Sequence, residues 1–184
     1  MYLGAKHMVT GYDHLLFLVG VIFFLYRLKD IAIYVSLFAV GHSSTLLFGV
    51  FTGIHINAYI IDAIIGLSVV YKALDNLGFL KKWLGFQPNT KVSTFIFGLF
   101  HGFGLAAKII EFDLDPVGLL SNLISFNIGV EIGQLLALST ILIMISYWRK
   151  RPSFLSYSVT TNIILMVLGF ILAAQQILGY INSI

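Results

Sequence analysis

Long apolar stretches alternate with short polar segments along the whole of this 184-residue chain. A helix needs about 20 apolar residues to cross the hydrocarbon core of a bilayer. Six stretches satisfy this length, at about 8–26, 31–52, 57–75, 92–110, 117–147 and 158–182. The pattern therefore predicts an all-α polytopic membrane protein, in which six transmembrane helices form one bundle and residues 1–184 make a single integral membrane domain.

The polar segments predict how these helices are joined. The segment "DNLGFLKKWLGFQPNTK" (75–91) is short, basic and amphipathic and contains Trp83, which favours an interfacial helix or loop. Asp115 followed by Pro116 predicts the start of the fifth helix, because Asp is a common N-cap and Pro a common first helical residue. We expect His55, in the short segment "GIHIN", to be solvated.

The composition indicates that lipid surrounds most of the chain. Hydrophobic residues make up 59% of it and charged residues 10%, with a mean hydropathy of +0.96, whereas soluble domains carry about 25% charged residues. We therefore expect membrane lipids as partners and, despite a net charge of +3, no nucleic acid. The absence of cysteine excludes disulfides and thiolate metal sites. The first apolar stretch exceeds the core of a signal peptide, so we expect it to be retained.

Basic residues predict the orientation of the bundle. They follow or flank the first, third and fifth apolar stretches, whereas only Lys6 and Lys108 fall on the other side. Because Lys and Arg concentrate in cytoplasmic loops, we predict a multi-pass protein with three cytoplasmic basic loops and both the N- and C-termini outside. The residues of these loops are Arg27, Lys29, Lys72, Lys81, Lys82, Lys91, Arg149, Lys150 and Arg151.

Five of the six stretches place an ionisable side chain at a similar depth, at or just outside the middle of the membrane. An unpaired charge there costs about 3 kcal/mol on insertion scales. We therefore predict that these groups face one interior point, where they pair or bind a cation, as a polar His/Asp/Glu layer inside the bundle. The residues are Asp13, His14, His42, Asp62, His101 and Glu131.

Helical spacing supports a shared interior site. Residues three, four or seven apart lie on one helix face, so Asn127, Glu131 and Gln134 form one polar stripe. His7 and His14, seven apart, share a face in the same way. Pairs of glycines four residues apart bracket His101 and Glu131 and allow helix backbones to approach closely. These polar side chains are therefore expected on the packed interior.

Histidine and carboxylate without cysteine suit a divalent ion such as Zn, Ni, Co or Mn. If four protein ligands bind the ion, the site is closed, and if water takes one position, the site can be catalytic. If the ligands exchange easily, it is a transport site. The same residues also fit a proton relay without a metal. We expect His14, His42 and His101 as nitrogen ligands, with Asp13 as a fourth ligand or as the acceptor that fixes a histidine tautomer. We expect Glu131 and Asp62 to act as ligand, proton acceptor or, in a hydrolase, catalytic base. Ser43, Asn127 and Gln134 are expected to orient these groups. An arriving cation is expected to meet His7, Asp113 and Asp115 first.

Five segments of the chain resemble the HupE/UreJ family of bacterial membrane proteins, in particular its second branch. They are "GAKHMVTGYDHLLFL", "FAVGHSSTLLFG", "DAIIGLSVVYKALDN", "FGLFHGFGLA" and "FNIGVEIGQL", in family order. The matching positions are His7, Asp13, His14, His42, Ser43, Asp62, Asn76, His101, Asn127, Glu131 and Gln134. The resemblance implies a nickel or cobalt permease of the bacterial cytoplasmic (inner) membrane, with metalloenzyme maturation proteins as candidate partners. Asp62 stands where the family is expected to have glutamate.

The resemblance leaves three functions open. The first is a nickel/cobalt-type metal permease, although the chain lacks the internal repeat of many secondary transporters. The second is an intramembrane zinc-dependent hydrolase, because a six-helix bundle with a His/Asp layer also resembles membrane hydrolases of the ceramidase and adiponectin-receptor type. The third is a metal-binding or proton-coupled accessory protein without either activity. Each metal-dependent alternative requires a divalent transition metal, either Ni, Co or Zn.

Overall fold

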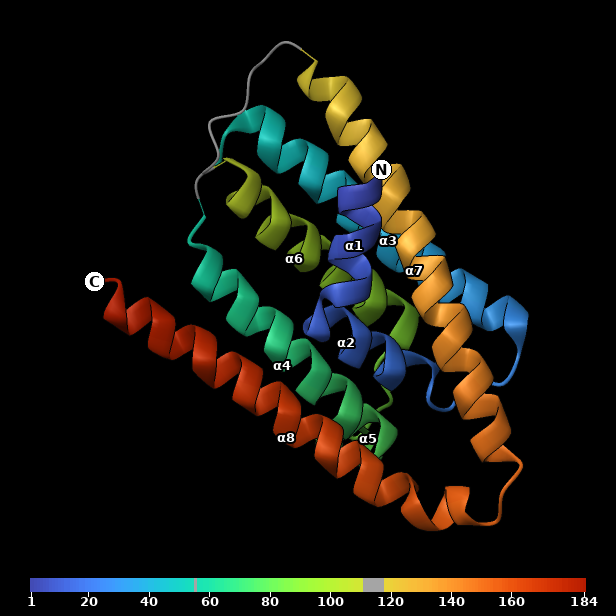
Figure 1. Ribbon diagram of the computed structural model, residues 1–184. Helices are drawn as coiled ribbons and strands as arrows, with labels where there is room; N and C mark the ends of the chain where they lie inside the picture. The colour runs from blue at the N-terminus through green and yellow to red at the C-terminus, as the bar shows by residue number, and fades with distance from the viewer. Residues whose placement is uncertain (55, 111–117) are drawn as a thin grey trace.

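The computed structural model describes residues 1–54, 56–110 and 118–184, and within these ranges the regular secondary structure is entirely helical. The helices run in both directions along one bundle (Figure 1). They are α1 (Tyr2–Thr10), α2 (Tyr12–Ile22), α3 (Leu28–Thr52), α4 (Ala58–Asn76), α5 (Phe79–Leu84), α6 (Thr90–Ile110), α7 (Leu119–Arg149) and α8 (Ser153–Asn182). The predicted all-helical class is therefore confirmed for the described residues.

The predicted count of six spanning helices is not confirmed. Among the described helices, only α3, α6, α7 and α8 are long and apolar enough to cross a membrane. The first predicted span is divided at Gly11 into α1 and α2, which have 9 and 11 residues and are each too short to cross alone. Helix α4 has 19 residues but carries Asp62, Lys72 and Asp75. The amphipathic segment after it forms α5, as one of the two predicted alternatives, and its Trp83 is exposed.

Three pairs of helices pack through glycines at very close range. Figure 1 shows two of these pairs side by side: α4 with α8, and α1 with α7. A Cβ added to Gly66 of α4 would lie 2.7 Å from the backbone nitrogen of Ala173 in α8. In the third pair, α3 with α6, a Cβ on Gly102 would overlap the carbonyl oxygen of His42. Small residues therefore bring these backbones into contact, as in other membrane helix pairs.

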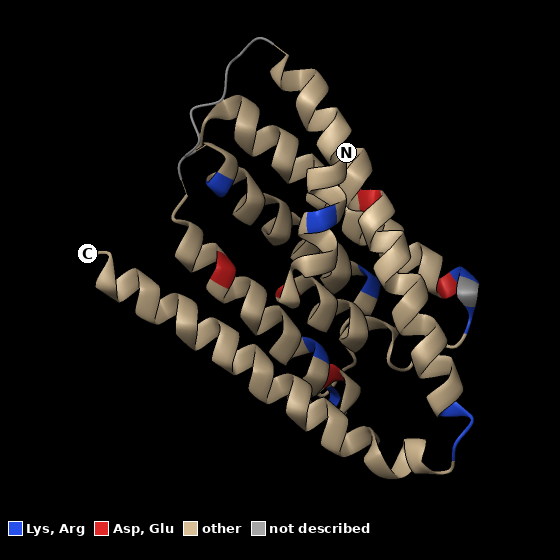
Figure 2. Ribbon diagram, in the orientation of Figure 1, with Lys and Arg blue, Asp and Glu red and all other residues tan. Residues whose placement is uncertain are grey.

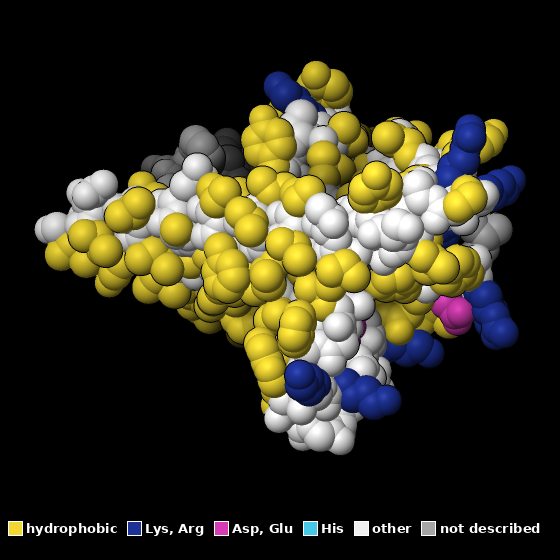
Figure 3. Space-filling model, turned by 90° about the horizontal axis from the view of Figure 1, so that it is seen from below, with side chains coloured by type: hydrophobic (Ala, Val, Ile, Leu, Met, Phe, Trp, Pro, Cys, Tyr) yellow, Lys and Arg dark blue, Asp and Glu magenta, His cyan; other side chains and the backbone are white. Residues whose placement is uncertain are grey.

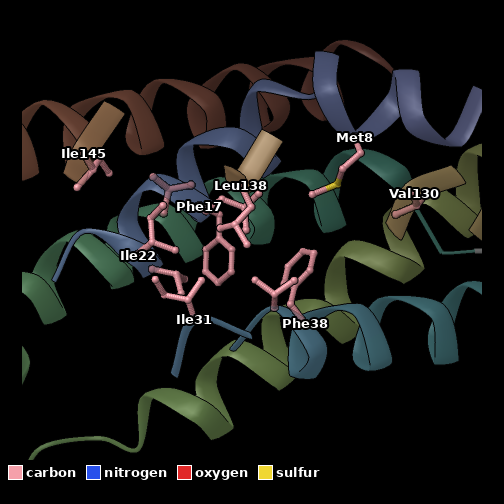
Figure 4. Close-up of a cluster of buried hydrophobic side chains, with 12 residues drawn as sticks. Met8, Phe17, Ile22, Ile31, Phe38, Val130, Leu138 and Ile145 are labelled. Carbon is pink, nitrogen blue, oxygen red and sulfur yellow. The ribbon is translucent and has the colours of Figure 1, made fainter. Parts of the chain in front are cut away.

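An aromatic and aliphatic core lies mainly between α2, α3 and α7. Phe17 and Phe38 are each 1% exposed, and their ring centroids are 5.5 Å apart. Met8, Ile22 and Leu138 belong to the same cluster (Figure 4). Because such a core is packed as densely as a crystal, it fixes the position of α2 and of the residues that begin it.

Arg149, at the end of α7, holds the other end of α2. Its guanidinium donates hydrogen bonds to the carbonyl oxygens of Leu25 and Phe23, each at 2.7 Å, and to that of Ile22. It also lies 4.4 Å from the ring centroid of Tyr26. The last carbonyls of a helix have no partner within the helix. Arg149 therefore caps the C-terminal end of α2 and connects the non-helical segment after it to α7.

The surface agrees with a membrane protein. Apolar side chains cover the face in Figure 3, and Lys and Arg project at its margins. Figure 2 shows basic residues gathered toward the end of the bundle where α3 begins and α7 ends. Lys6 belongs to α1, and Lys108 to the last turn of α6. This distribution matches the asymmetry from which the orientation was predicted, and the orientation itself stays a prediction. His55, Asp113, Asp115 and Pro116 lie outside the described residues.

Candidate metal centre

The break at Gly11 places two of the predicted ligands at the start of α2. The Gly11 backbone is extended, and its N–H donates to the carbonyl oxygen of His7 at the end of α1. Asp13 and His14 follow in the first turn of α2, and His14 Nδ1 lies 2.9 Å from Asp13 Oδ1. A Cβ on Gly11 would lie 2.8 Å from His14 Nδ1 and 3.0 Å from Asp13 Oδ1. The absence of a side chain at this position therefore leaves room for the Asp13–His14 pair.

The α3–α6 pair supplies the other two histidines. His42 and His101 are 0% and 1% exposed. The close approach at Gly102 brings His101 beside α3, and Thr45 Oγ1 donates a hydrogen bond to the Leu99 carbonyl oxygen across the pair at 2.7 Å. His101 Nδ1 lies 2.7 Å from the carbonyl oxygen of Phe97. Because a carbonyl can only accept, Nδ1 carries the proton and Nε2 has a free lone pair.

The four imidazoles form one cluster centred on His14. The ring centroid of His14 lies 4.8 Å from that of His101, 5.1 Å from that of His7 and 6.1 Å from that of His42. Potential ligand atoms of Asp13, His14 and His101 all lie within 4.8 Å of one another. These three residues could therefore hold a metal ion with small movements of their side chains.

The ring nitrogens of this cluster lack the partners that buried polar atoms normally have. Among the described residues no hydrogen-bond partner exists for the buried Nε2 atoms of His7, His14 and His101, or for either nitrogen of His42. Most buried polar side-chain atoms in proteins are hydrogen-bonded, because leaving one unpaired costs about 1–3 kcal/mol. Several such nitrogens around one point fit a cation better than they fit a packed core. The donor set of imidazole and carboxylate suits a divalent transition metal.

His7 is neutral near pH 7 and lies on α1, outside the four candidate spans. Burial, and next the neighbouring His14, lower the pKa of His7 to about 4. A neutral imidazole keeps a lone pair for a metal. His7 can therefore act as a ligand without first losing a proton.

A pocket of about 340 Å³ reaches this cluster from the surface. Its lining includes His7 and Asp13, Asp62 and Lys108, and Gln176 of α8. The Asp62 carboxylate forms an ion pair in this pocket, because Lys108 Nζ lies 2.6 Å from Asp62 Oδ2. The pocket therefore exposes His7 and Asp13 of the candidate metal centre, with the Asp62–Lys108 ion pair in the same pocket.

The whole chain, residues 1–184, matches a family described as HupE / UreJ protein. The chain belongs to the HupE/UreJ family. Comparison with curated proteins and with solved structures finds no further match. The HupE/UreJ motifs identified in the sequence supply all of the histidines in the cluster, and the family is associated with nickel and cobalt handling in bacterial membranes.

The structure does not bring every HupE/UreJ motif residue to this cluster. Glu131 is exposed and lies in a groove lined by Val35 and Ser36 of α3, apart from the pocket beside His7. Asn127 and Gln134 are buried, and Asn127 Oδ1 and Gln134 Nε2 have no hydrogen-bond partner in the described chain. Ser43 follows His42 on α3 and is half-buried. The sequence reasoning missed Lys108 as the partner of Asp62, although Lys108 lies on the face of α6 that carries His101, seven residues away.

Replacing Gly11 with alanine tests the local geometry of this site. We expect Gly11→Ala to weaken Co²⁺ binding by about tenfold, because the added methyl displaces the side chains of Asp13 and His14. The thermal midpoint should change little, because the contacted atoms belong mostly to side chains that can move. Titration of the purified protein with CoCl₂ and a melting curve measure the two effects. An unchanged cobalt affinity would show that the glycine does not position this pair.

Proposed function

We propose that this protein is a permease that carries a divalent transition-metal cation, nickel or cobalt first, across the bacterial cytoplasmic membrane. The observation that carries the proposal is the convergence of buried imidazole nitrogens that have no protein partner in the described structure. Asp13, His14 and His101 would hold the ion, with His42 behind them. The metal is the cargo in this proposal, so the site must release it as well as bind it.

The spacing of the imidazoles supports movement of the ion rather than permanent storage. His7 lines the pocket, His14 is 3% exposed and His42 is fully buried. The rings of His7 and His14, and of His14 and His42, have centroids 5.1 and 6.1 Å apart. An ion can therefore exchange one ligand at a time along this line and is never stripped of all its ligands inside the low-dielectric interior, which would be far more costly.

An intramembrane metal-dependent hydrolase is the second candidate. The observation that favours it is the pocket beside the cluster, in which the Asp62 carboxylate lies. In that case a bound Zn²⁺ would activate water, and Asp62 would be the nearer candidate base; Glu131 lies in a separate groove. The third candidate, a metal-binding accessory protein, predicts binding with neither flux nor turnover. Metalloenzyme maturation proteins are the proposed partners in the first and third cases, and both termini are proposed to lie outside.

Uptake into proteoliposomes separates these candidates. We expect vesicles that contain the wild-type protein and a metal-sensitive dye to take up Ni²⁺ or Co²⁺ several times faster than empty vesicles, and the His42→Ala/His101→Ala protein to take up metal no faster than empty vesicles. The matched control is Asp30→Asn, a carboxylate in the first turn of α3, which should keep wild-type uptake. Stoichiometric metal binding without any flux would contradict the permease, and turnover of a lipid or peptide substrate would then favour the hydrolase.

A further inference from the structure

The ion pair between Asp62 and Lys108 lies in the pocket that borders the candidate metal centre. Asp62 of α4 and Lys108 of α6 line the pocket together with His7 and Asp13. The Asp62 side chain is 12% exposed, whereas that of Lys108 is 45% exposed. Lys108 therefore approaches from the solvent side, and the carboxylate lies deeper in the pocket.

Helix geometry places Asp62 close to the candidate metal centre. A Cβ on Gly104 of α6 would lie 3.2 Å from Asp62 Oδ1, so this carboxylate lies against Gly104. Gly104 is three residues after His101, which corresponds to about 4.5 Å along the helix axis. The Asp62 carboxylate therefore lies about one turn of α6 from His101, toward the C-terminal end of that helix. Lys108, about one turn further along α6, reaches back to this carboxylate.

The Lys108 ammonium places a positive charge beside a candidate cation site. A positive charge repels an arriving divalent ion, and the repulsion is stronger in a pocket than in bulk water. The Asp62 carboxylate, however, is mostly buried and would be costly to leave unpaired. The lysine ammonium satisfies it, and a lysine on its flexible four-carbon stem can leave without any change in the backbone.

We propose that Lys108 is a tethered counter-ion, which occupies Asp62 when no metal is present and which an arriving divalent cation must displace. This proposal rests on the proposed function. It adds a first step, in which the cation binds at Asp62 before it reaches the histidine cluster. In this step the cation binds Asp62, and the Lys108 ammonium moves into solvent with its charge unchanged. The cation then reaches Asp13, His14 and His101. Lys108 stays in solvent while the cation is bound and returns to Asp62 when the site is empty. A monovalent ion competes less well with the ammonium because it carries half the charge of a divalent ion.

The two members of the pair should have opposite effects on metal binding. Lys108→Met removes the competing charge and should tighten Co²⁺ binding by about tenfold. Asp62→Asn removes the carboxylate, leaves the positive charge in the pocket, and should weaken Co²⁺ binding by about tenfold. A pair that only stabilises the contact between α4 and α6 predicts instead that either substitution weakens binding or has no effect. Lys108→Arg should bind no more tightly than the wild type, because arginine holds carboxylates more firmly.

The experiment is a calorimetric titration of each full-length variant in detergent with CoCl₂. Lys6→Met is the matched control, because it removes the same charge from an exposed position that does not line the pocket. Tighter binding by Lys108→Met, weaker binding by Asp62→Asn and unchanged binding by Lys6→Met would support the proposal. Equal tightening by Lys108→Met and Lys6→Met would overturn it, because the effect would then come from total charge. Unchanged or weaker binding by Lys108→Met would overturn it as well.

The same titration keeps this inference separate from the proposed function. If the His42→Ala/His101→Ala protein binds Co²⁺ as the wild type does, the histidine site itself is wrong. If that variant loses binding while Lys108→Met equals the wild type, the histidine site stands and only the role of Lys108 fails. A folding defect cannot imitate the expected result, because misfolding does not raise affinity.

Discussion

Replacing His14 with alanine should lower the affinity for Co²⁺ or Ni²⁺ at least a hundredfold, to roughly the limit of detection. Partners that only orient a ligand contribute ten- to a hundredfold to metal affinity, so a ligand itself should contribute more. His14 is the centre of the cluster, with His101 and His7 on either side and Asp13 on its Nδ1. Its Nε2 is buried and unpaired among the described residues. Elemental analysis and the visible spectrum of bound cobalt measure the loss.

The comparison with Asp13→Asn shows how Asp13 acts. If Asp13 only accepts a hydrogen bond from His14 Nδ1–H and so fixes its tautomer, asparagine should weaken binding by about ten- to a hundredfold and leave the cobalt spectrum almost unchanged. If Asp13 is itself a ligand, the spectrum should change together with the affinity. Asp30→Asn, which removes a carboxylate at the far end of α3 from the cluster, should bind cobalt as the wild type does. An His14→Ala protein that is folded and still binds cobalt within about threefold of the wild type would refute the proposed centre.

Much of this arrangement could be predicted from the sequence. The stretches 31–52, 92–110, 117–147 and 158–182 correspond to helices α3, α6, α7 and α8 within a few residues. The cost of a charge in hydrocarbon was enough to predict that histidines from different helices meet, because each alone would be unfavourable. The structure places His14, His42 and His101 in one cluster.

Two features could not be predicted in the same way. Hydropathy averages over about 20 residues, so it passes over one extended glycine, and Gly11 therefore appeared to lie within a continuous helix. The second feature is the position of Glu131. At 100° per residue, Glu131 lies about 60° around α7 from Gln134, at the margin of the polar stripe. Whether a residue at the margin faces inward depends on which helix packs against it. In the structure α7 packs mainly on α1. The predicted six-helix arrangement did not contain α1 as a separate helix, so it could not place Glu131.

Valine at position 102 should be the most damaging single substitution among those considered for stability. A Cβ on Gly102 would overlap the His42 carbonyl oxygen and the Thr45 hydroxyl. One of these atoms is backbone and cannot rotate away, so α3 and α6 must separate. Overpacking typically costs 1–3 kcal/mol, and because valine adds two further carbons against the same backbone we expect a loss of about 3 kcal/mol. The exposed Ala174 of α8 offers the matched control, because Ala174→Val enlarges a helical residue without touching this pair.

The separation of α3 from α6 should also reach the metal centre, because His42 and His101 are on opposite members of the pair. We therefore expect Gly102→Val to lower both the thermal midpoint in detergent and the cobalt affinity, whereas Ala174→Val should change neither. Gly102→Ala places one carbon at the same point and should give an intermediate effect on both quantities. A Gly102→Val protein that melts within about 2 °C of the wild type would have lost only about 0.5–1 kcal/mol for a domain of this size. The close approach of α3 and α6 would then not be what holds the two histidines together.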